Sequence, residues 1–184
     1  MEYIVAIVIL GLIGLWVVSI YNKLVLNRNT VKEGWSGIET QLKRRSNLIP
    51  NLVEAVKGYV GHEKGVLENV TEARSRTGTA SSPAERGKME GILGQALANV
   101  FAVAEAYPEL KANENFINLH QELSSLEDEI QMARRYYNGT VRNLNVLIES
   151  FPSNIIAGSF NFVQAEFFEI EDEGDRAVPE VSFS

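Results

Sequence analysis

The chain has 184 residues, a net charge of −7, two histidines and no cysteine. This length suffices for one domain with a buried core, and the lack of cysteine excludes disulfides and thiolate metal sites. The acidic balance, without a recognition motif, argues against nucleic-acid binding, and two histidines argue against a multi-histidine metal site.

The first expected element is a membrane-spanning helix. Residues 3–20, YIVAIVILGLIGLWVVSI, carry no charge, and eighteen helical residues span about 27 Å, close to the roughly 30 Å hydrocarbon core of a bilayer. A cleaved signal peptide would need a basic start and a small-residue cleavage site, and neither is present. The sequence therefore predicts an uncleaved anchor over residues 1–22 that contacts the lipid bilayer through residues 3–20.

The orientation of this anchor is predicted from its flanking charges. Lys23, Arg28 and Lys32 follow the apolar run, and no cation precedes it. The positive-inside rule then places the N-terminus outside the cell and the following domain in the cytoplasm.

A heptad pattern of apolar residues follows the anchor. Steps of four and three from Val31 to Ala73 meet eleven apolar or aromatic residues in thirteen positions, a spacing that excludes a strand. It predicts one long helix, or two nearly collinear helices, ending near Arg76. Pro50 removes one helical hydrogen bond and predicts a kink near Ser46. The positions are Val31, Trp35, Ile38, Leu42, Arg45, Ile49, Leu52, Val56, Tyr59, Glu63, Val66, Val70 and Ala73.

A polar joint is expected beside this proline. The cations 43–45 lie about 35 Å of helix from the anchor, which argues against contact with phospholipid. Arg45 falls on the apolar pattern, so we expect it to be buried and to fix the helix register. Glu63, on the same pattern, is a candidate partner for Arg45 or Arg135. The predicted joint residues are Arg44, Arg45, Asn47, Pro50 and Asn51.

Two further helices are expected. Ser82-Pro83-Ala84-Glu85 reads as a capping box that starts a helix ending near Ala106. After a loop over residues 108–113, apolar residues recur in heptads from Phe116 to Phe151, where Pro152 ends the helix. Three long helices with short connections predict an all-α, elongated antiparallel bundle over residues 23–152.

The remaining residues, 153–184, are aromatic at first and then acidic. Aromatic side chains at this density are seldom left in water, so this tail is expected to dock on the bundle or on a neighbouring molecule. The runs 21–22 and 134–138 either pack within the bundle or form a subunit interface, where tyrosine and arginine are enriched. The candidate interface residues are Tyr21, Asn22, Tyr136, Tyr137, Asn138, Phe160, Phe162, Phe167 and Phe168.

The histidines do not form an enzyme motif. A zincin helix needs a second histidine four residues after His62, where this chain has Val66. A di-iron bundle needs Glu-x-x-His pairs, and neither His62 nor His120 follows such a glutamate. We therefore expect no catalytic residue, metal ligand or cofactor.

The stretches YNKLVLNRNTVKEGWSGIETQLKRRSNLIPNLVEAVKGYVGHE, VLENVTEAR, AEAYPELKANENFINLHQELSSLEDEIQMARRYYNGTVRNLNVLIESFP and FNFVQAEFFE resemble the LemA family. The resemblance covers essentially residues 3–183, and Gly34 departs from it because alanine is common there. It implies a bacterial inner-membrane protein with one N-terminal span and an elongated helical domain, associated with envelope or membrane maintenance. It implies no defined reaction.

Together these expectations favour a membrane-anchored, non-enzymatic helical scaffold that assembles into a homo-oligomer. The alternative is an adaptor or regulator of a membrane protease, which would be its partner. A third hypothesis is a metal-dependent hydrolase that uses His62, Glu63, His120 and Glu122.

Overall fold

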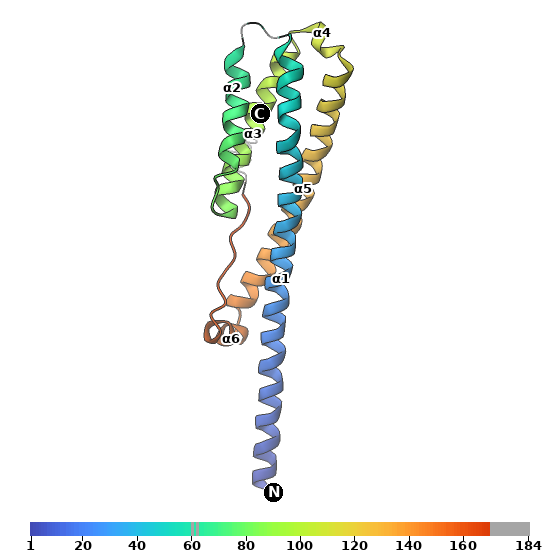
Figure 1. Cartoon of the computed structure of the whole chain (residues 1–184). Coiled ribbons are helices and arrows are strands. Elements are labelled where there is room, and N and C mark those ends of the chain that lie inside the picture. Colours follow the sequence, from blue (N-terminus) through green and yellow to red (C-terminus); the bar gives the residue numbers. More distant parts are fainter. Residues whose placement is uncertain (60, 62, 170–184) are drawn as a thin grey trace, which may run out of the picture. The chain divides into compact units, whose positions relative to one another are not determined.

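The computed structural model describes residues 1–59, 61 and 63–169, which form six helices and no strand (Figure 1). The predicted all-α class is therefore confirmed, whereas the acidic end of the chain, 170–184, lies outside the described residues. The helices are α1 Glu2–Lys57, α2 Lys64–Thr77, α3 Pro83–Ala104, α4 Pro108–Lys111, α5 Glu114–Glu149 and α6 Ser153–Ser159.

Of the two predicted alternatives through Arg76, the single long helix is wrong, because the chain breaks between α1 and α2. α1 continues through Pro50 but ends at Lys57, and α2 begins at Lys64 and packs on α3. Gly58 and Gly61 lie in this break, and each glycine costs a helix interior about 1 kcal/mol relative to alanine. The apolar positions after the break belong to a separate buried face of α2, which includes Val70 and Ala73. They continue the heptad spacing of α1 in the sequence although they lie on a different helix.

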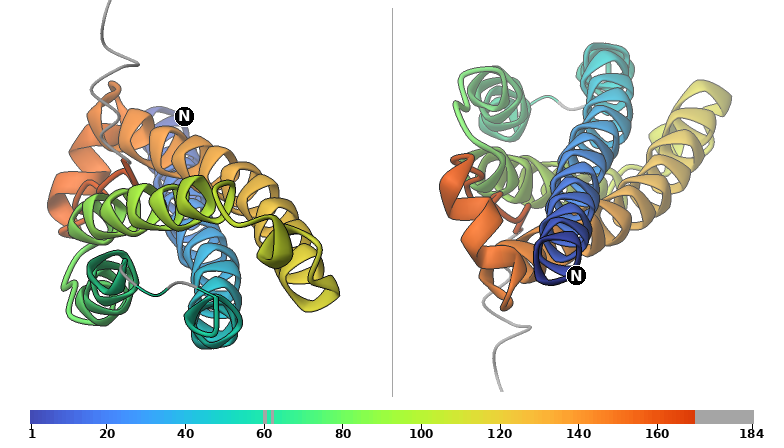
Figure 2. Two further views of the ribbon diagram at one scale, coloured as in Figure 1. Left: turned by 90° about the horizontal axis from the view of Figure 1, so that it is seen from above. Right: turned by 90° about the horizontal axis from the view of Figure 1, so that it is seen from below.

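The contacts divide the chain into two units, and each contains part of α1 and part of α5. We call residues 1–40 with 130–167 the anchor unit, and residues 41–129 with 168–169 the bundle unit. The helices of the chain are seen from two further directions in Figure 2.

The bundle unit is built around one apolar core. Segments of α1, α2, α3, α4 and α5 contribute to it, and α2 packs mainly on α3. Ser82 caps α3 by accepting a hydrogen bond from the Glu85 amide at 3.3 Å, with Pro83 as the first helical residue, as predicted. The Glu85 carboxylate accepts a hydrogen bond from the Ser81 amide at 2.7 Å, and this bond holds the pKa of Glu85 below its usual value. The core residues are Ile49, Leu52, Val56, Val70, Ala73, Leu93, Ala96, Leu97, Val100, Ala104, Leu110, Phe116 and Leu123.

The anchor unit contains the first part of α1, the end of α5, α6 and the segment that follows α6. The predicted heptad of α5 is buried here at Ile130, Tyr137 and Leu144. It fails at Phe151, which is 80% exposed because α5 has already ended at Glu149.

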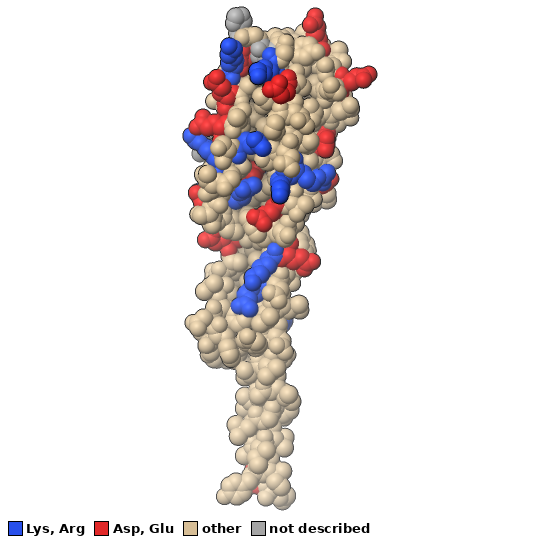
Figure 3. Space-filling model, viewed as in Figure 1, with Lys and Arg blue, Asp and Glu red and all other residues tan. Residues whose placement is uncertain are grey.

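The N-terminal part of α1 is the segment that the sequence predicts to span the membrane. It is long and apolar enough to cross a membrane, with a mean hydropathy of 2.7 and no buried residue in its most apolar window. On the face drawn in Figure 3, the surface of this segment is almost entirely uncharged. These properties match the membrane anchor that the sequence predicts.

Candidate functional site

A buried ion-pair network lies in the bundle unit, centred on Arg45. The heptad position of Arg45 directs its side chain into the bundle, and the residue is only 2% exposed. Its guanidinium pairs with Glu90 of α3 and, through Nη1, with Glu127 of α5 at 2.7 Å. The expected burial of Arg45 is therefore confirmed, and this one side chain links three helices.

Glu90 is the acidic centre of this network. It is 2% exposed, and both of its carboxylate oxygens accept hydrogen bonds from arginine. Arg86, one turn earlier on α3, donates from Nε to Glu90 at 2.9 Å and from Nη1 to the Thr77 carbonyl at 2.5 Å. Two cations and two anions thus compensate each other, as burial of charge requires.

The proline in α1 is compensated by a side chain from α2. Pro50 has no amide hydrogen, so it leaves the carbonyl of Ser46 without its helical donor. Arg74 donates from Nε to this carbonyl at 2.8 Å and to the Ser46 hydroxyl at 3.1 Å. Arg74 was not among the residues predicted for the joint.

The other predicted joint residues lie on the surface. Arg44, Asn47, Pro50 and Asn51 are exposed. Arg44 forms an ion pair with Glu129 at 2.7 Å, and its side chain remains half exposed.

The predicted pairing of Glu63 with Arg45 is wrong. Glu63 accepts a hydrogen bond from the Tyr107 hydroxyl at 2.7 Å, and Arg45 pairs with Glu90 and Glu127. This bond raises the pKa of Tyr107.

A second constellation, in the anchor unit, holds the aromatic segment against α5. The Tyr137 hydroxyl donates to the Glu166 carbonyl at 2.8 Å, and Tyr137 packs on Trp35 with ring centroids 5.4 Å apart. Asn145 exchanges two hydrogen bonds with the backbone of Ala165, at 2.9 and 3.0 Å. Burial is the main cause that raises the pKa of Tyr137 to about 12, and the charge of Glu166 adds to it.

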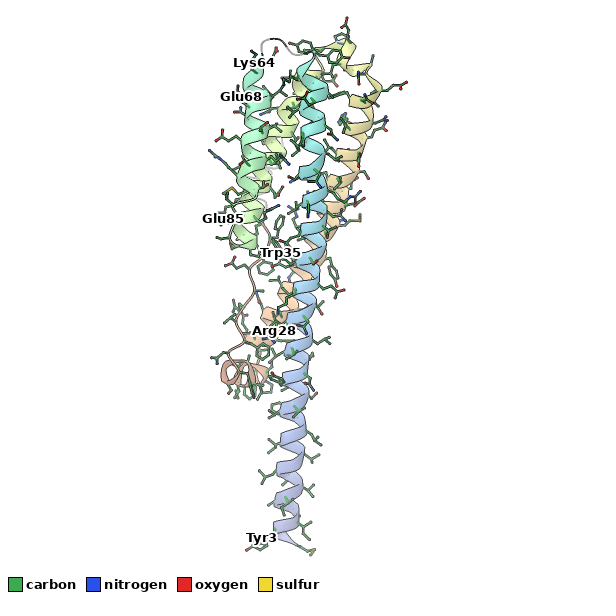
Figure 4. All side chains as sticks on the ribbon, in the orientation of Figure 1. Tyr3, Arg28, Trp35, Lys64, Glu68 and Glu85 are labelled. Carbon is green, nitrogen blue, oxygen red and sulfur yellow. The ribbon has the colours of Figure 1, made fainter. Side chains whose placement is uncertain are left out.

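The same segment also contacts α1. The Tyr21 ring lies 4.8 Å from that of Phe160 and 5.8 Å from that of Phe162, measured between centroids. The guanidinium carbon of Arg28, labelled with Trp35 in Figure 4, lies 5.0 Å from the Phe162 centroid. The aromatic residues after α6 therefore dock on their own chain, one of the two outcomes expected from sequence.

This docking revises the predicted interface residues. Tyr137, Phe162 and Phe168 are at most 8% exposed, so they pack within their own chain and we no longer assign them to an interface. Phe167 and Asn138 are partly buried. The exposed candidates are Tyr21, Asn22, Tyr136 and Phe160.

The chain is similar to known proteins over most of its length. The LemA family model matches residues 34–183, which include both constellations. The chain belongs to the LemA family. The magnetosome protein MamQ 2 of Paramagnetospirillum magneticum is 25% identical over 184 residues, covering 86% of this chain and 68% of that protein. Protein LemA of Metamycoplasma hominis is 28% identical over 156 residues, covering 82% and 69% respectively.

The hydrolase hypothesis gains no support from this LemA family chain. His120 stacks on Phe101 with ring centroids 4.3 Å apart, and Glu122 is exposed. Among the described residues, no three histidine or acidic side chains are grouped so that they could hold a metal ion. His62 lies outside the described residues.

Sequence reasoning missed Glu90 and Arg74. The buried face of α3 contains Gly87, Glu90, Leu93 and Leu97. The signal was present in this spacing of three, three and four, but a glutamate is by default assigned to the surface. Arg74 could be found only by asking which donor satisfies the carbonyl that Pro50 leaves free.

Proposed function

We propose that this LemA family protein is a membrane-anchored helical scaffold that assembles with copies of itself and performs no chemistry. The single helix α1 contains both the apolar segment and Arg45, so the anchor and the bundle unit share one secondary-structure element. The buried charged residues that the structure describes, Arg45 and Glu90, are engaged in ion pairs, as expected of a structural network.

The observation that carries this proposal is an outward-facing stripe on α5. Steps of four and three join Met132, Tyr136, Gly139, Asn143 and Val146, none of which is charged. Met132 and Tyr136 are 55% exposed and Val146 is 52% exposed. We call these five residues the α5 stripe. It lies on the same helix as the buried heptad but is a separate set of positions.

The composition of the α5 stripe suits a second copy of the chain. Interfaces are enriched in tyrosine and methionine and depleted in lysine and glutamate. A glycine in the middle of the stripe allows close approach of a second helix. Most homo-oligomers have closed symmetry, in which one surface can pair with itself. We therefore assign the stripe to a contact between identical subunits.

The test is the native mass of the full-length protein in mild detergent. We expect a discrete oligomer for the natural sequence. The double variant Met132→Lys with Val146→Lys would place charge in the contact and should convert this oligomer to monomer. Ser124→Lys is the matched control, because Ser124 is exposed on the same helix and lies about 80° around it from Met132 of the stripe.

Two outcomes would contradict the proposal. A natural protein that is monomeric over a wide concentration range would exclude self-assembly. An oligomer that survives the double variant would remove the α5 stripe from the contact.

A further inference from the structure

An uncharged stretch surrounds α6. Residues 150–165, SFPSNIIAGSFNFVQA, contain no acidic or basic side chain. They include three phenylalanines and two adjacent isoleucines. Outside the N-terminal anchor, an uncharged run of this composition is unusual for a segment at the surface of a protein.

Several large side chains of this stretch are exposed. Phe151 is 80% exposed, Val163 79%, Ile155 58% and Phe160 53%. We call these four residues the α6 corner. Their exposure contrasts with Phe162 in the same stretch, which is 8% exposed and packs against α1.

The contacts of this stretch fix its level along α1. Phe160 packs on Tyr21, the residue that follows the apolar segment, and Phe162 packs under Arg28. Residues 21 and 28 are separated by about 10 Å along a helix. The segment that follows α6 therefore lies beside the first turns of α1 after the apolar run. In Figure 1, α6 likewise lies beside the part of α1 that directly follows the apolar segment.

We propose that the α6 corner is a second membrane contact, which inserts into the boundary between lipid headgroups and acyl chains where α1 leaves the bilayer. This inference rests on the membrane anchoring in the proposed function, but not on self-assembly. Apolar side chains held at this level can enter the interfacial region, where amphipathic segments bind.

The neighbouring charges favour a lipid surface over a second protein molecule. Lys23 and Arg28 follow the apolar segment on α1, at a level where cations attract anionic headgroups. The surface near α6 and the apolar segment is almost free of acidic side chains on the face drawn in Figure 3. The α6 corner thus continues the uncharged surface of the anchor.

Because the natural chain contains no cysteine, each introduced cysteine is a single site for a spin label. Single cysteines would replace Phe151, Ile155 and Val163 in the full-length protein, reconstituted in vesicles of phosphatidylethanolamine and phosphatidylglycerol. Collisions with oxygen report lipid, and collisions with a water-soluble nickel chelate report the aqueous phase. Ile9→Cys, in the apolar segment, is the lipid reference. Gly37→Cys, an exposed position of the same unit with open space around it, is the aqueous reference.

We expect the labels at 151, 155 and 163 to have high oxygen and low nickel accessibility, shifted toward the values at position 9. High nickel accessibility, as at position 37, would overturn the inference by placing the corner in water. Low accessibility to both reagents would overturn it in favour of a protein contact. A label at position 9 that is open to the nickel chelate would instead contradict the anchoring on which the proposed function depends.

Discussion

Arg44 and Arg45 are neighbours in the sequence, but their side chains have opposite surroundings. Arg44 pairs with Glu129 while half exposed, and Arg45 is buried between Glu90 and Glu127. An exposed pair contributes at most about 1 kcal/mol, whereas removal of one partner from a buried pair costs about 3–5 kcal/mol. Although the two arginines are adjacent, the Arg45 ion pairs are therefore expected to contribute more to stability than the Arg44 ion pair.

The two arginines provide a matched test at the residue scale. Arg45→Met is expected to lower the free energy of unfolding by about 3 kcal/mol, because Glu90 loses a buried cation. Arg44→Met is expected to change it by less than about 1 kcal/mol. Thermal unfolding of the full-length protein in detergent, followed by circular dichroism, measures both. The double variant Arg45→Met with Glu90→Met should recover part of the loss, since no buried charge at position 90 then needs a partner.

Equal losses for Arg44→Met and Arg45→Met would contradict this assignment. They would mean that burial of the ion pair contributes nothing beyond the local change in the helix.

Tyr137 gives a prediction for alkaline pH. Its pKa is raised from 10.0 to about 12 in the folded protein, so folding favours the neutral phenol. The stability from this group is complete below pH 10 and is lost as the pH rises toward 12, by about 1.4 kcal/mol per pH unit. Unfolding of the natural protein and of Tyr137→Phe between pH 9 and pH 11.5 measures this loss.

The natural protein should show the steeper decline, because phenylalanine at position 137 cannot ionise. Parallel pH dependences for the two proteins would show that Tyr137 titrates at an ordinary pKa.

At the scale of single elements, α1 is a helix whose hydrogen bonding is completed by α2. In a regular helix the Ser46 carbonyl would accept a hydrogen bond from the amide of residue 50. Because residue 50 is proline, the Arg74 side chain donates to this carbonyl instead. Arg74→Met should cost about 1–3 kcal/mol of unfolding free energy, since it leaves a partly buried carbonyl unsatisfied. In a Pro50→Ala background the cost should be smaller, because the alanine amide can donate to Ser46.

A double-mutant cycle in thermal unfolding checks this coupling. Additive effects of the two substitutions would mean that Arg74 stabilises the bundle through contacts unrelated to the proline.

A close contact between α3 and the end of the described chain gives a second prediction at this scale. A Cβ atom at Gly87 would overlap the carbonyl oxygen of Glu169, whereas one at Gly94 on the same helix would meet nothing within 4 Å. Gly87→Ala should therefore lower stability by about 1–3 kcal/mol through overpacking. Gly94→Ala should raise it by up to about 1 kcal/mol through helix propensity.

Limited proteolysis alongside thermal unfolding locates the effect. Faster cleavage after residue 160 is expected in Gly87→Ala and not in Gly94→Ala. Stabilisation by both substitutions would show that the last described residues do not pack on α3 in solution.

For the whole molecule, heptad spacing predicted the helical class, α5 and the buried face of α1 as far as Val56, and the capping box predicted α3. It could not predict the break after Lys57, because Val66, Val70 and Ala73 of α2 continue the same spacing by coincidence. The fold of the aromatic segment was also out of reach, because irregular backbone is held by individual side chains such as Asn145. Within the site, Arg45 was predictable from its register and Glu90 was not, since a buried glutamate is recognised only with its cation.

The compensation of Pro50 by Arg74 has a consequence for biosynthesis. When α1 has left the ribosome, the donor for its Ser46 carbonyl has not yet been made, because Arg74 is twenty-eight residues further along the chain. Water must occupy that position until the chain has reversed and α2 has docked. The proline thereby makes completion of the first helix depend on the arrival of the second, which couples the two helices in the order in which they are translated.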